Sequence, residues 1–181
     1  MARVNPRQTA RLQAPVLLAD LLLYRLSRLL ATGGHPVIRL CEGRYGITRR
    51  EWRVLSLLAE QPGVLSSSQL AQLAQLDRAR TSRAITSLAA KGLLRREAGP
   101  ADRRQVRLSL TAAGQALHDE LFPQVASVNR ELLAVLDEQE AAALQQALER
   151  LQARADELLG SAAALPKADR RRGRTARRAP G

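Results

Sequence analysis

The sequence predicts a mainly α-helical fold with one small β-wing, and three observations support this prediction. Leu and Ala are abundant, while aromatic residues make up only 2% of the 181 residues, a composition that favours helices. Apolar residues recur at spacings of three and four in several long segments, as on one face of a helix. Residues 93–110 instead contain two strand-like runs around a Gly-Pro turn. The length suits one compact domain with disordered ends.

The first part of the chain predicts a flexible basic N-terminus at residues 1–14, then an N-terminal dimerisation helix and connector at residues 15–46. Pro15 can open this helix, which is expected to reach residue 31. Leucines cover more of it than one surface helix needs, which favours packing both into its own chain and against a partner. The alternative is a fully buried core helix. Residues 32–36 are expected to break the helix, and a short helical turn follows.

A second helix is predicted to begin at Thr48 and to end at Pro62-Gly63. Thr48 and Glu51 have the spacing of a capping box, in which each side chain bonds the backbone N–H of the other residue. Ile47 and Trp52 occupy the staple positions on either side of it. We therefore expect Trp52 to belong to the core rather than to a ligand site.

Two shorter helices follow, joined by a tight turn. Ser66 and Gln69 form a capping box at the start of the first, and Asp77 can cap the start of the second. Lys91-Gly92 has the composition of a helix end, with a cation in the last turn and then a residue that tolerates left-handed geometry.

The second of these helices has an apolar face, carrying Thr81, Ile85 and Leu88, and an open face suited to a DNA major groove. Small residues permit close approach, hydroxyls reach phosphates and base edges, and arginine can bind guanine through two hydrogen bonds. An ordinary solvated helix is the alternative. The open face carries Ala79, Ser82, Arg83 and Thr86, with Arg78 and Arg80 beside it near the N-terminus.

A hairpin is predicted next, with strands at residues 93–97 and 106–110. Its tip holds Asp102, Arg103 and Arg104. An arginine on a protruding hairpin can enter a minor groove, where a narrow groove concentrates negative potential. A solvated polar turn is the alternative for the tip alone. The order helix, turn, helix and basic hairpin predicts a winged helix-turn-helix domain at residues 47–114.

The rest of the chain predicts C-terminal dimerisation helices at residues 115–159 and a disordered Arg-rich tail at residues 160–181. Thr111 is expected to cap a helix reaching about residue 134, and Asp137 with Glu140 to open a last helix reaching about residue 159. Leucines near a heptad spacing line the last helix. The tail could hold additional phosphates or serve only solubility.

Charge is distributed unevenly along the chain, although the net value is +12. Residues 61–110 carry nine cations and three acids, whereas residues 111–160 carry three cations and nine acids. A uniformly basic surface would suit non-specific binding. This division instead favours a duplex held on one side of the molecule.

Several other classes of protein are disfavoured. The two histidines do not have metal-ligand spacing, and we find no Gly-rich phosphate loop or nucleophile elbow, so we expect no enzyme, metal or cofactor. A single cysteine excludes an intramolecular disulfide and suits a reducing cytosol. No apolar run reaches transmembrane length, and residues 1–13 do not resemble a signal peptide, so we expect a cytoplasmic protein without a membrane partner.

The sequence resembles the MarR (multiple antibiotic resistance regulator) family of bacterial transcription factors. The similarity is tight from residue 47 to residue 114, and by order of elements it extends over residues 15–158. The residues that carry it are Ile47-Thr48, Glu51-Trp52-Arg53-Val54-Leu55, Gln69-Leu70-Ala71, Leu76-Asp77-Arg78, Ser82-Arg83, Lys91-Gly92-Leu93, Asp102-Arg103-Arg104, Leu108-Ser109-Leu110-Thr111 and Gly114.

This resemblance implies a homodimeric regulator, most simply a repressor, that binds an inverted-repeat operator in double-stranded DNA. It gives Asp102 the role of bracing the wing and Arg104 the role of entering the minor groove. The full set of expected DNA contacts is Ser66, Ser67, Arg78, Arg80, Ser82, Arg83, Thr86, Arg103 and Arg104.

The resemblance also implies an effector, and two kinds are weighed. A small aromatic or phenolic acid could be bound by His35, Arg39, Arg44 and Trp52. Alternatively, Cys41 could sense oxidants, because nearby cations lower a thiol pKa, although a packing role is the simpler interpretation. A non-specific nucleoid-type architectural protein is the alternative to a sequence-specific regulator, favoured by the basic tail and opposed by the acidic helices.

Overall fold

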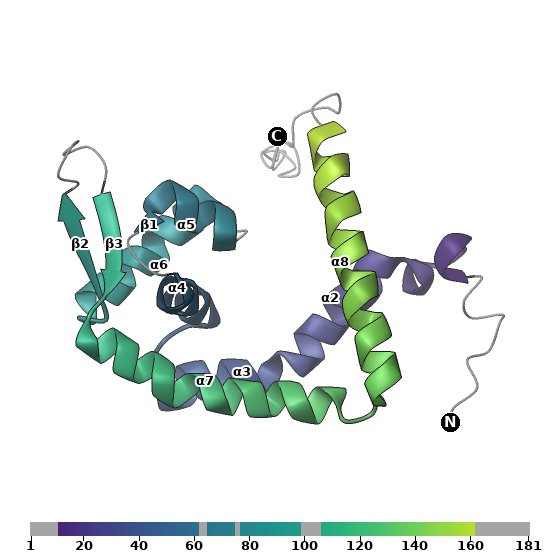
Figure 1. The fold of residues 1–181 in the computed structure, drawn as a ribbon, viewed down its shortest axis with the longest axis horizontal. Helices are drawn as coiled ribbons and strands as arrows, with labels where there is room; N and C mark the ends of the chain where they lie inside the picture. Colours follow the sequence, from purple (N-terminus) through teal and green to yellow (C-terminus); the bar gives the residue numbers. More distant parts are fainter. Residues whose placement is uncertain (1–10, 62–64, 75–76, 99–105, 162–181) are drawn as a thin grey trace, which may run out of the picture. The chain divides into compact units, whose positions relative to one another are not determined.

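The computed structural model describes residues 11–61, 65–74, 77–98 and 106–161 (Figure 1). The chain divides into two compact units, Met1–Leu132 and Leu133–Gly181, and each is described by itself. The elements of the first unit, with α7 ending at the boundary, are η1 Leu18–Asp20, α2 Leu22–Gly33, α3 His35–Ile38, the π-helical turn η2 Arg39–Arg44, α4 Arg49–Glu60, β1 Leu65–Ser66, α5 Ser67–Ala74, α6 Arg78–Ala90, β2 Leu94–Ala98, β3 Val106–Leu110 and α7 Ala112–Leu133. The second unit contains α8, Glu138–Ser161.

The start of the first long helix was predicted wrongly. The carboxylate of Asp20 accepts the backbone N–H groups of Val16 and Leu17, which holds a separate 3₁₀ turn, and Leu21 is extended, so α2 begins only at Leu22. Residues 11–13, expected within a flexible N-terminus, are helical. They read Arg-Leu-Gln, and all three are good helix formers.

The expected break at residues 32–36 is much smaller than predicted. Gly34 keeps right-handed geometry, with φ −81° and ψ −9°, and its N–H still bonds the carbonyl of Leu30 at 3.1 Å. Pro36 lies in the first turn of α3, where a backbone N–H would have no partner within that helix, so its absence costs no hydrogen bond. The backbone therefore continues to coil through α2, α3 and η2.

The predicted helix starts are confirmed by their caps. Thr48 and Glu51 form the capping box of α4, and Ser66 and Gln69 bond each other's backbone N–H at 2.9 and 3.2 Å before α5. The Oδ1 atom of Asp77 accepts the N–H of Arg80 at 2.7 Å at the start of α6. These bonds join residues three apart, so the sequence alone could specify them.

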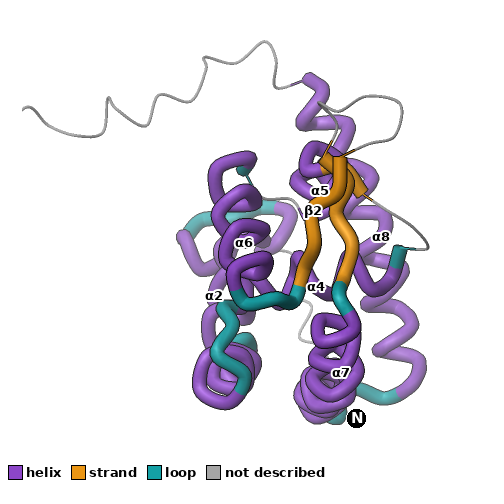
Figure 2. The backbone as a smooth tube through the Cα atoms, turned by 90° about the vertical axis from the view of Figure 1, so that its left-hand side faces the viewer, coloured by secondary structure: helices purple, strands orange, loops and turns teal. Residues whose placement is uncertain are grey.

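The core lies where α4, α5 and α6 meet the small sheet, and β2 and β3 run beside α6 (Figure 2). This packing buries the apolar faces of the two shorter helices and leaves the outer face of α6 exposed. The largest fully buried aliphatic side chains are Ile47, Leu55, Leu70, Leu88, Leu108 and Leu121. Trp52 is also buried, as expected.

The sheet has three antiparallel strands in the order β1-β3-β2, with Leu94 opposite Leu110 and Leu65 opposite Leu108. The hairpin was predicted with its first strand one residue early, at 93–97 instead of Leu94–Ala98. The two-residue strand β1 was missed because it is too short to show alternation. The predicted wing tip, with Asp102, Arg103 and Arg104, lies outside the described residues.

Helix α7 follows the wing through a close backbone contact. Thr111 Oγ1 accepts the N–H of Gly114 and donates to the carbonyl of Gly92. A Cβ atom at Gly114 would lie 2.0 Å from the carbonyl oxygen of Leu93, so this position needs glycine. The contact holds the start of α7 against the end of α6.

In the second unit, Asp137 and Glu140 form the predicted capping box of α8. The helix ends at Ser161, two residues beyond the expected end, and Leu144, Leu148 and Leu151 along its predicted seam are exposed in the single chain. Residues 162–181 of the predicted tail lie outside the described residues. Within the described part of the chain, no helix combines the length and apolarity needed to cross a membrane.

Candidate nucleic-acid interface

The outer face of α6 is open and carries the predicted DNA-facing side chains. Its inner face is fixed by Thr81, Ala84, Ile85 and Leu88, all buried. Because a helix turns 100° per residue, the residues opposite this buried face point outward. The exposed residues there are Ala79, Ser82, Arg83 and Thr86, with Arg78 and Arg80 on the two flanks.

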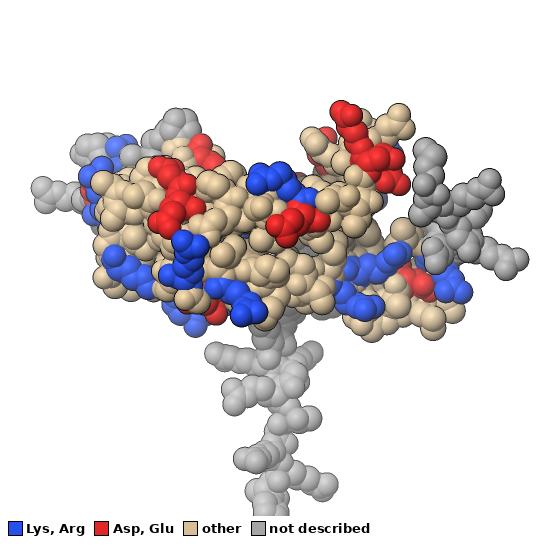
Figure 3. Space-filling view, turned by 90° about the horizontal axis from the view of Figure 1, so that it is seen from below, with Lys and Arg blue, Asp and Glu red and all other residues tan. Residues whose placement is uncertain are grey.

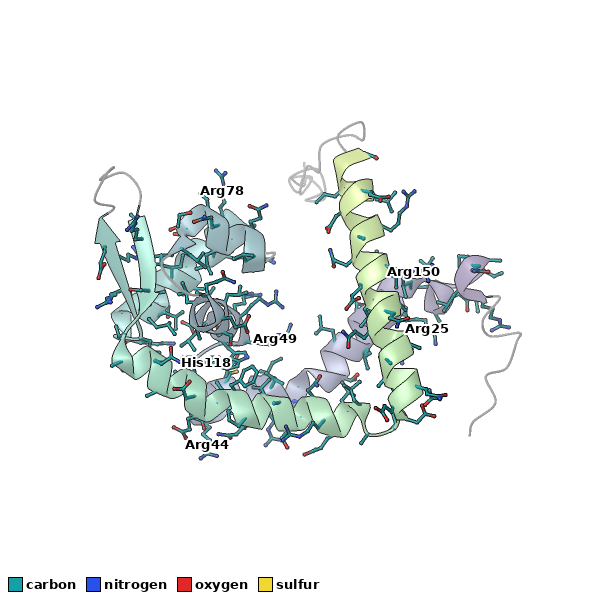
Figure 4. All side chains as sticks on the ribbon, viewed as in Figure 1. Arg25, Arg44, Arg49, Arg78, His118 and Arg150 are labelled. Carbon is teal, nitrogen blue, oxygen red and sulfur yellow. The ribbon has the colours of Figure 1, made fainter. Side chains whose placement is uncertain are left out.

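One flank of α6 forms a groove with α5 and the wing strands, which we call the wing-side groove. Its volume is about 250 Å³. Three of the predicted contacts, Ser67, Arg78 and Ser82, line it, and Figure 4 shows Arg78 pointing outward above the helices. The full lining is Ser67, Ser68, Arg78, Thr81, Ser82, Ile85, Arg96 and Val106.

Arg96 is a candidate contact that the sequence reasoning missed. It lies on β2, opposite Leu108, and its Nη2 donates to Thr86 Oγ1 on α6 at 2.7 Å. Leu94 and Arg96 are two residues apart on one strand, so Arg96 faces the helix like Leu94. This alternation of side chains along the strand could have revealed the position of Arg96 from the sequence. This bond joins the wing to the outer face of α6, and it engages the Thr86 hydroxyl that was expected to contact base edges.

The other flank of α6 forms a second groove with the start of α4, which we call the α4-side groove. Its volume is about 310 Å³, and two predicted contacts, Arg80 and Arg83, line it. Arg80 is paired with Asp77 at 3.1 Å, and Arg83 Nε donates to the carbonyl of Ala79 at 3.3 Å. The remaining lining residues are Thr48, Arg50, Glu51, Ala84 and Ser87.

Ser66 is placed differently from the other predicted contacts. Its Oγ accepts the N–H of Gln69, and it does not line the wing-side groove, whereas Ser67 does. Elsewhere, on the surface seen in Figure 3, acidic and basic side chains are interspersed rather than gathered into one patch.

The first unit also contains a pocket of about 370 Å³ between α2, α3, α4 and α7. Of the four expected ligand contacts, Trp52 lines it, but His35, Arg39 and Arg44 do not. The cations that line it are Arg49 and Arg53, which were not among the expected ligand contacts. The other lining residues are Leu30, Gly34, Val37, Ser56, Leu57, Glu60, Phe122 and Val125.

Arg44 is held at the outer side of α7, away from this pocket (Figure 4). Its guanidinium bonds Gln124 at 3.3 Å, lies 3.8 Å from a carboxylate oxygen of Glu120 and stacks over the ring of Tyr45. These contacts occupy the group that was expected to bind a ligand carboxylate.

Three residues of α4 in the pocket wall have notable surroundings. Arg53 Nη1 donates to the carbonyl of Ala74 at 3.1 Å, at the end of α5. The Oγ atom of Ser56 is buried and has no hydrogen-bond partner among the described residues. Trp52 stacks on His118 of α7 with 5.6 Å between ring centroids. Arg53 thus joins the pocket wall to the end of α5.

Cys41 is fully buried, with 0% of its surface exposed. Burial raises the pKa of its thiol to about 11, and the carboxylate of Glu42 adds to this, while Arg49 opposes it only weakly. The expectation that nearby cations lower this pKa is therefore wrong, because the cost of burying a thiolate outweighs their attraction.

Comparisons with known proteins agree with this arrangement. The sequence model of the MarR family matches residues 45–105. The "Homoprotocatechuate degradative operon repressor" of Escherichia coli is 29% identical over 99 residues, and the match spans 55% of this chain but only 64% of that repressor, less than two thirds.

Two solved structures are similar over most of their lengths. A probable transcriptional regulator from Pseudomonas aeruginosa is 30% identical with a TM-score of 0.60, and the match covers 69% of this chain and 95% of that chain. The PcaV transcriptional regulator from Streptomyces coelicolor, solved in complex with its natural ligand, is 27% identical with a TM-score of 0.65, and the match covers 77% and 97% of the two chains.

Proposed function

We propose that this chain, which belongs to the MarR family of transcriptional regulators, represses transcription by binding an inverted-repeat operator as a homodimer. The observation that carries the proposal is the outer face of α6, with hydroxyls and arginines flanked by two cation-lined grooves. A helix with such a face fits the major groove, where bases present distinct hydrogen-bonding patterns.

Within this proposal, the predicted contacts divide by position. Ser82, Arg83 and Thr86 face the base edges, Arg78 and Ser67 face the backbone at the wing-side groove, and Arg80 faces the backbone on the other flank. Arg96 supports Thr86 from the wing. Arg103 and Arg104 of the wing tip, with Asp102 as its brace, remain proposed minor-groove residues.

The proposed homodimer accounts for apolar surface that one chain leaves exposed. Several leucines are exposed in the single chain, namely Leu23, Leu29 and Leu30 of α2 and the leucine seam of α8. Exposed apolar side chains on a monomer are normally scattered singly, so a row of them along a helix indicates a covered interface. Covering them with a second copy would set two recognition helices one helical turn apart, at about 34–36 Å, on an operator with matching two-fold symmetry.

An effector site is part of the proposal. The pocket beside Trp52 combines apolar walls with the guanidinium groups of Arg49 and Arg53, which suits a small aromatic acid. The similar PcaV structure contains that protein's natural ligand, and the similar E. coli repressor is named for homoprotocatechuate degradation. Binding of such an acid would release the operator.

A salt-controlled titration tests the proposal, using the duplex upstream of the chain's own reading frame and a scrambled duplex of equal length. We expect an affinity ratio of about a thousand or more with one dimer per site. Adding homoprotocatechuate or related hydroxylated aromatic acids should lower affinity for the specific duplex.

The alternative function is a nucleoid-type architectural protein. It predicts nearly equal affinities for the upstream and scrambled duplexes, with a steep dependence of affinity on salt. A genome-wide binding map would then show binding without preferred sites. The exposed face of α6 and the two grooves beside it suit one helix seated in a major groove, and they favour the sequence-specific regulator over the architectural protein.

A further inference from the structure

The two grooves lie on opposite flanks of the recognition helix. Arg78 lines the wing-side groove and Arg80 lines the α4-side groove, and two residues along a helix correspond to a rotation of about 200°. The helix therefore presents a cationic flank on each side of its base-reading face.

A duplex has matching geometry. The major groove is about 12 Å wide, and a helix with its side chains is about 10–12 Å in diameter, so a seated helix has one sugar-phosphate strand against each flank. The wing-side groove accounts for one strand. The other strand must pass over the opposite flank, where the α4-side groove lies.

The chemistry of the α4-side groove suits phosphate. Arg50, Arg80 and Arg83 line it together with the hydroxyls of Thr48 and Ser87. Arg50 is exposed, and no ion pair of its guanidinium is found among the described residues. The N-terminal end of α4 also faces this groove, and its partial positive charge favours an anion.

Glu51 is the one carboxylate in the described lining, and it does not oppose an anion. Its side chain is only 4% exposed, and Lys91 neutralises it at 3.0 Å. The same carboxylate accepts the N–H of Thr48 within the helix cap. The groove therefore presents the positive charges of Arg50 and Arg83 to an incoming phosphate, while Arg80 is already paired with Asp77 at 3.1 Å.

We infer that the α4-side groove seats the second DNA backbone strand and that Arg50 is a phosphate-contacting residue. This inference rests on the proposed function, since it requires α6 to occupy a major groove. It extends the DNA footprint from the helix-turn-helix and wing to the start of α4.

The test compares Arg50→Ala with Arg50→Lys in salt titrations of the full chain on the specific and scrambled duplexes. Each phosphate contact contributes about 0.9 to the slope of log K against log salt, so a dimer that loses two should have a slope shallower by about 1.8. We expect affinity for both duplexes to fall by a similar factor, on the order of tenfold per contact at 0.1 M salt. Arg50→Lys keeps the charge and should retain the slope.

Arg150→Ala is the matched control, because it removes one exposed arginine from α8 (Figure 4) and should leave the slope nearly unchanged. Thermal unfolding of each variant checks that the fold is retained. Equal slopes for Arg50→Ala and Arg150→Ala would overturn the inference while leaving DNA binding intact. Loss of specific binding alone, with an unchanged slope, would overturn the phosphate assignment. If the wild-type chain binds neither duplex, the proposed function fails first and the inference fails with it.

Discussion

The Nζ atom of Lys91 lies 3.0 Å from Oε2 of Glu51, and this ion pair joins the end of α6 to the start of α4. Lys91 also donates to the carbonyl of Gly46 at 2.8 Å. The Glu51 side chain is almost fully buried, while the Lys91 side chain is 36% exposed. One lysine thus holds the recognition helix against the helix that lines both the α4-side groove and the pocket.

Replacing Lys91 with Met should destabilise the fold by about 1–3 kcal/mol, because it leaves the Glu51 carboxylate buried without its cation. Urea unfolding measures this change. In the double variant with Glu51→Gln, much of the loss should be recovered, since no buried charge remains. Strictly additive effects of the two substitutions would show that the pair is not coupled.

The same carboxylate predicts a dependence of stability on pH. Burial alone would raise the pKa of Glu51, but hydrogen bonds from Ser87, Thr48 and Lys91 and the charge of Lys91 outweigh it and hold the pKa below its ordinary value of 4.5. Because the pKa is lower in the folded state, this stabilisation is present above about pH 4.5 and is lost as pH falls through the folded pKa. Glu51→Gln should remove this part of the acid dependence, measured by urea midpoints from pH 3 to 7. Parallel curves for the two proteins would contradict it.

Gly114→Ala should destabilise the first unit by about 1–3 kcal/mol, the usual cost of forcing atoms into a filled space. The new Cβ would lie 2.0 Å from the backbone oxygen of Leu93, which cannot move without shifting the link between α6 and β2. Gly43→Ala is the control, since nothing lies within 4 Å of its Cβ position. Thermal melts compare them, and equal melting temperatures would show that α7 can shift to make room.

Arg53 should couple the effector pocket to the DNA-binding helices. Its guanidinium lines the pocket and also bonds the carbonyl of Ala74 at the end of α5, so a ligand carboxylate would compete for it. We expect Arg53→Met to keep specific DNA binding but to lose most of the change in affinity caused by an aromatic acid, a change that is typically 5–150-fold in allosteric proteins. Operator titrations with and without the acid measure this.

Arg39→Ala and Arg44→Ala provide the comparison for Arg53, because neither residue lines the pocket. Both variants should retain the response to the acid. If they lose it while Arg53→Met keeps it, the effector binds on the side that the sequence suggested.

Cys41 should react slowly in the folded protein. The thiol is buried and its pKa is raised to about 11, so the reactive thiolate is scarce at pH 7. Labelling with a thiol reagent should be much faster after unfolding in urea than before it. Peroxide should leave operator affinity unchanged in both the wild type and Cys41→Ser. Rapid labelling of the native protein would revive the redox-sensing alternative.

The sequence by itself determined the features that depend on neighbouring residues. The caps of α4, α5, α6 and α8 each join residues three apart, and the periodicity of Thr81, Ile85 and Leu88 specified which face of α6 is buried. The exposed recognition face followed directly from that periodicity. Short-range hydrogen bonds and helical spacing require no knowledge of what packs nearby, so these predictions succeeded.

Only the tertiary structure decided which distant side chains meet. Arg96 reaches Thr86 across ten residues, Arg53 reaches Ala74 across twenty-one, and Lys91 reaches Glu51 across forty. It also placed Arg49 in the pocket in place of Arg44, and it buried Cys41 despite the cations near it in sequence. Helix and strand packing decides which partner a long polar side chain meets, and it decides the burial that raises the pKa of Cys41. Neither is written in the spacing of residues along the chain.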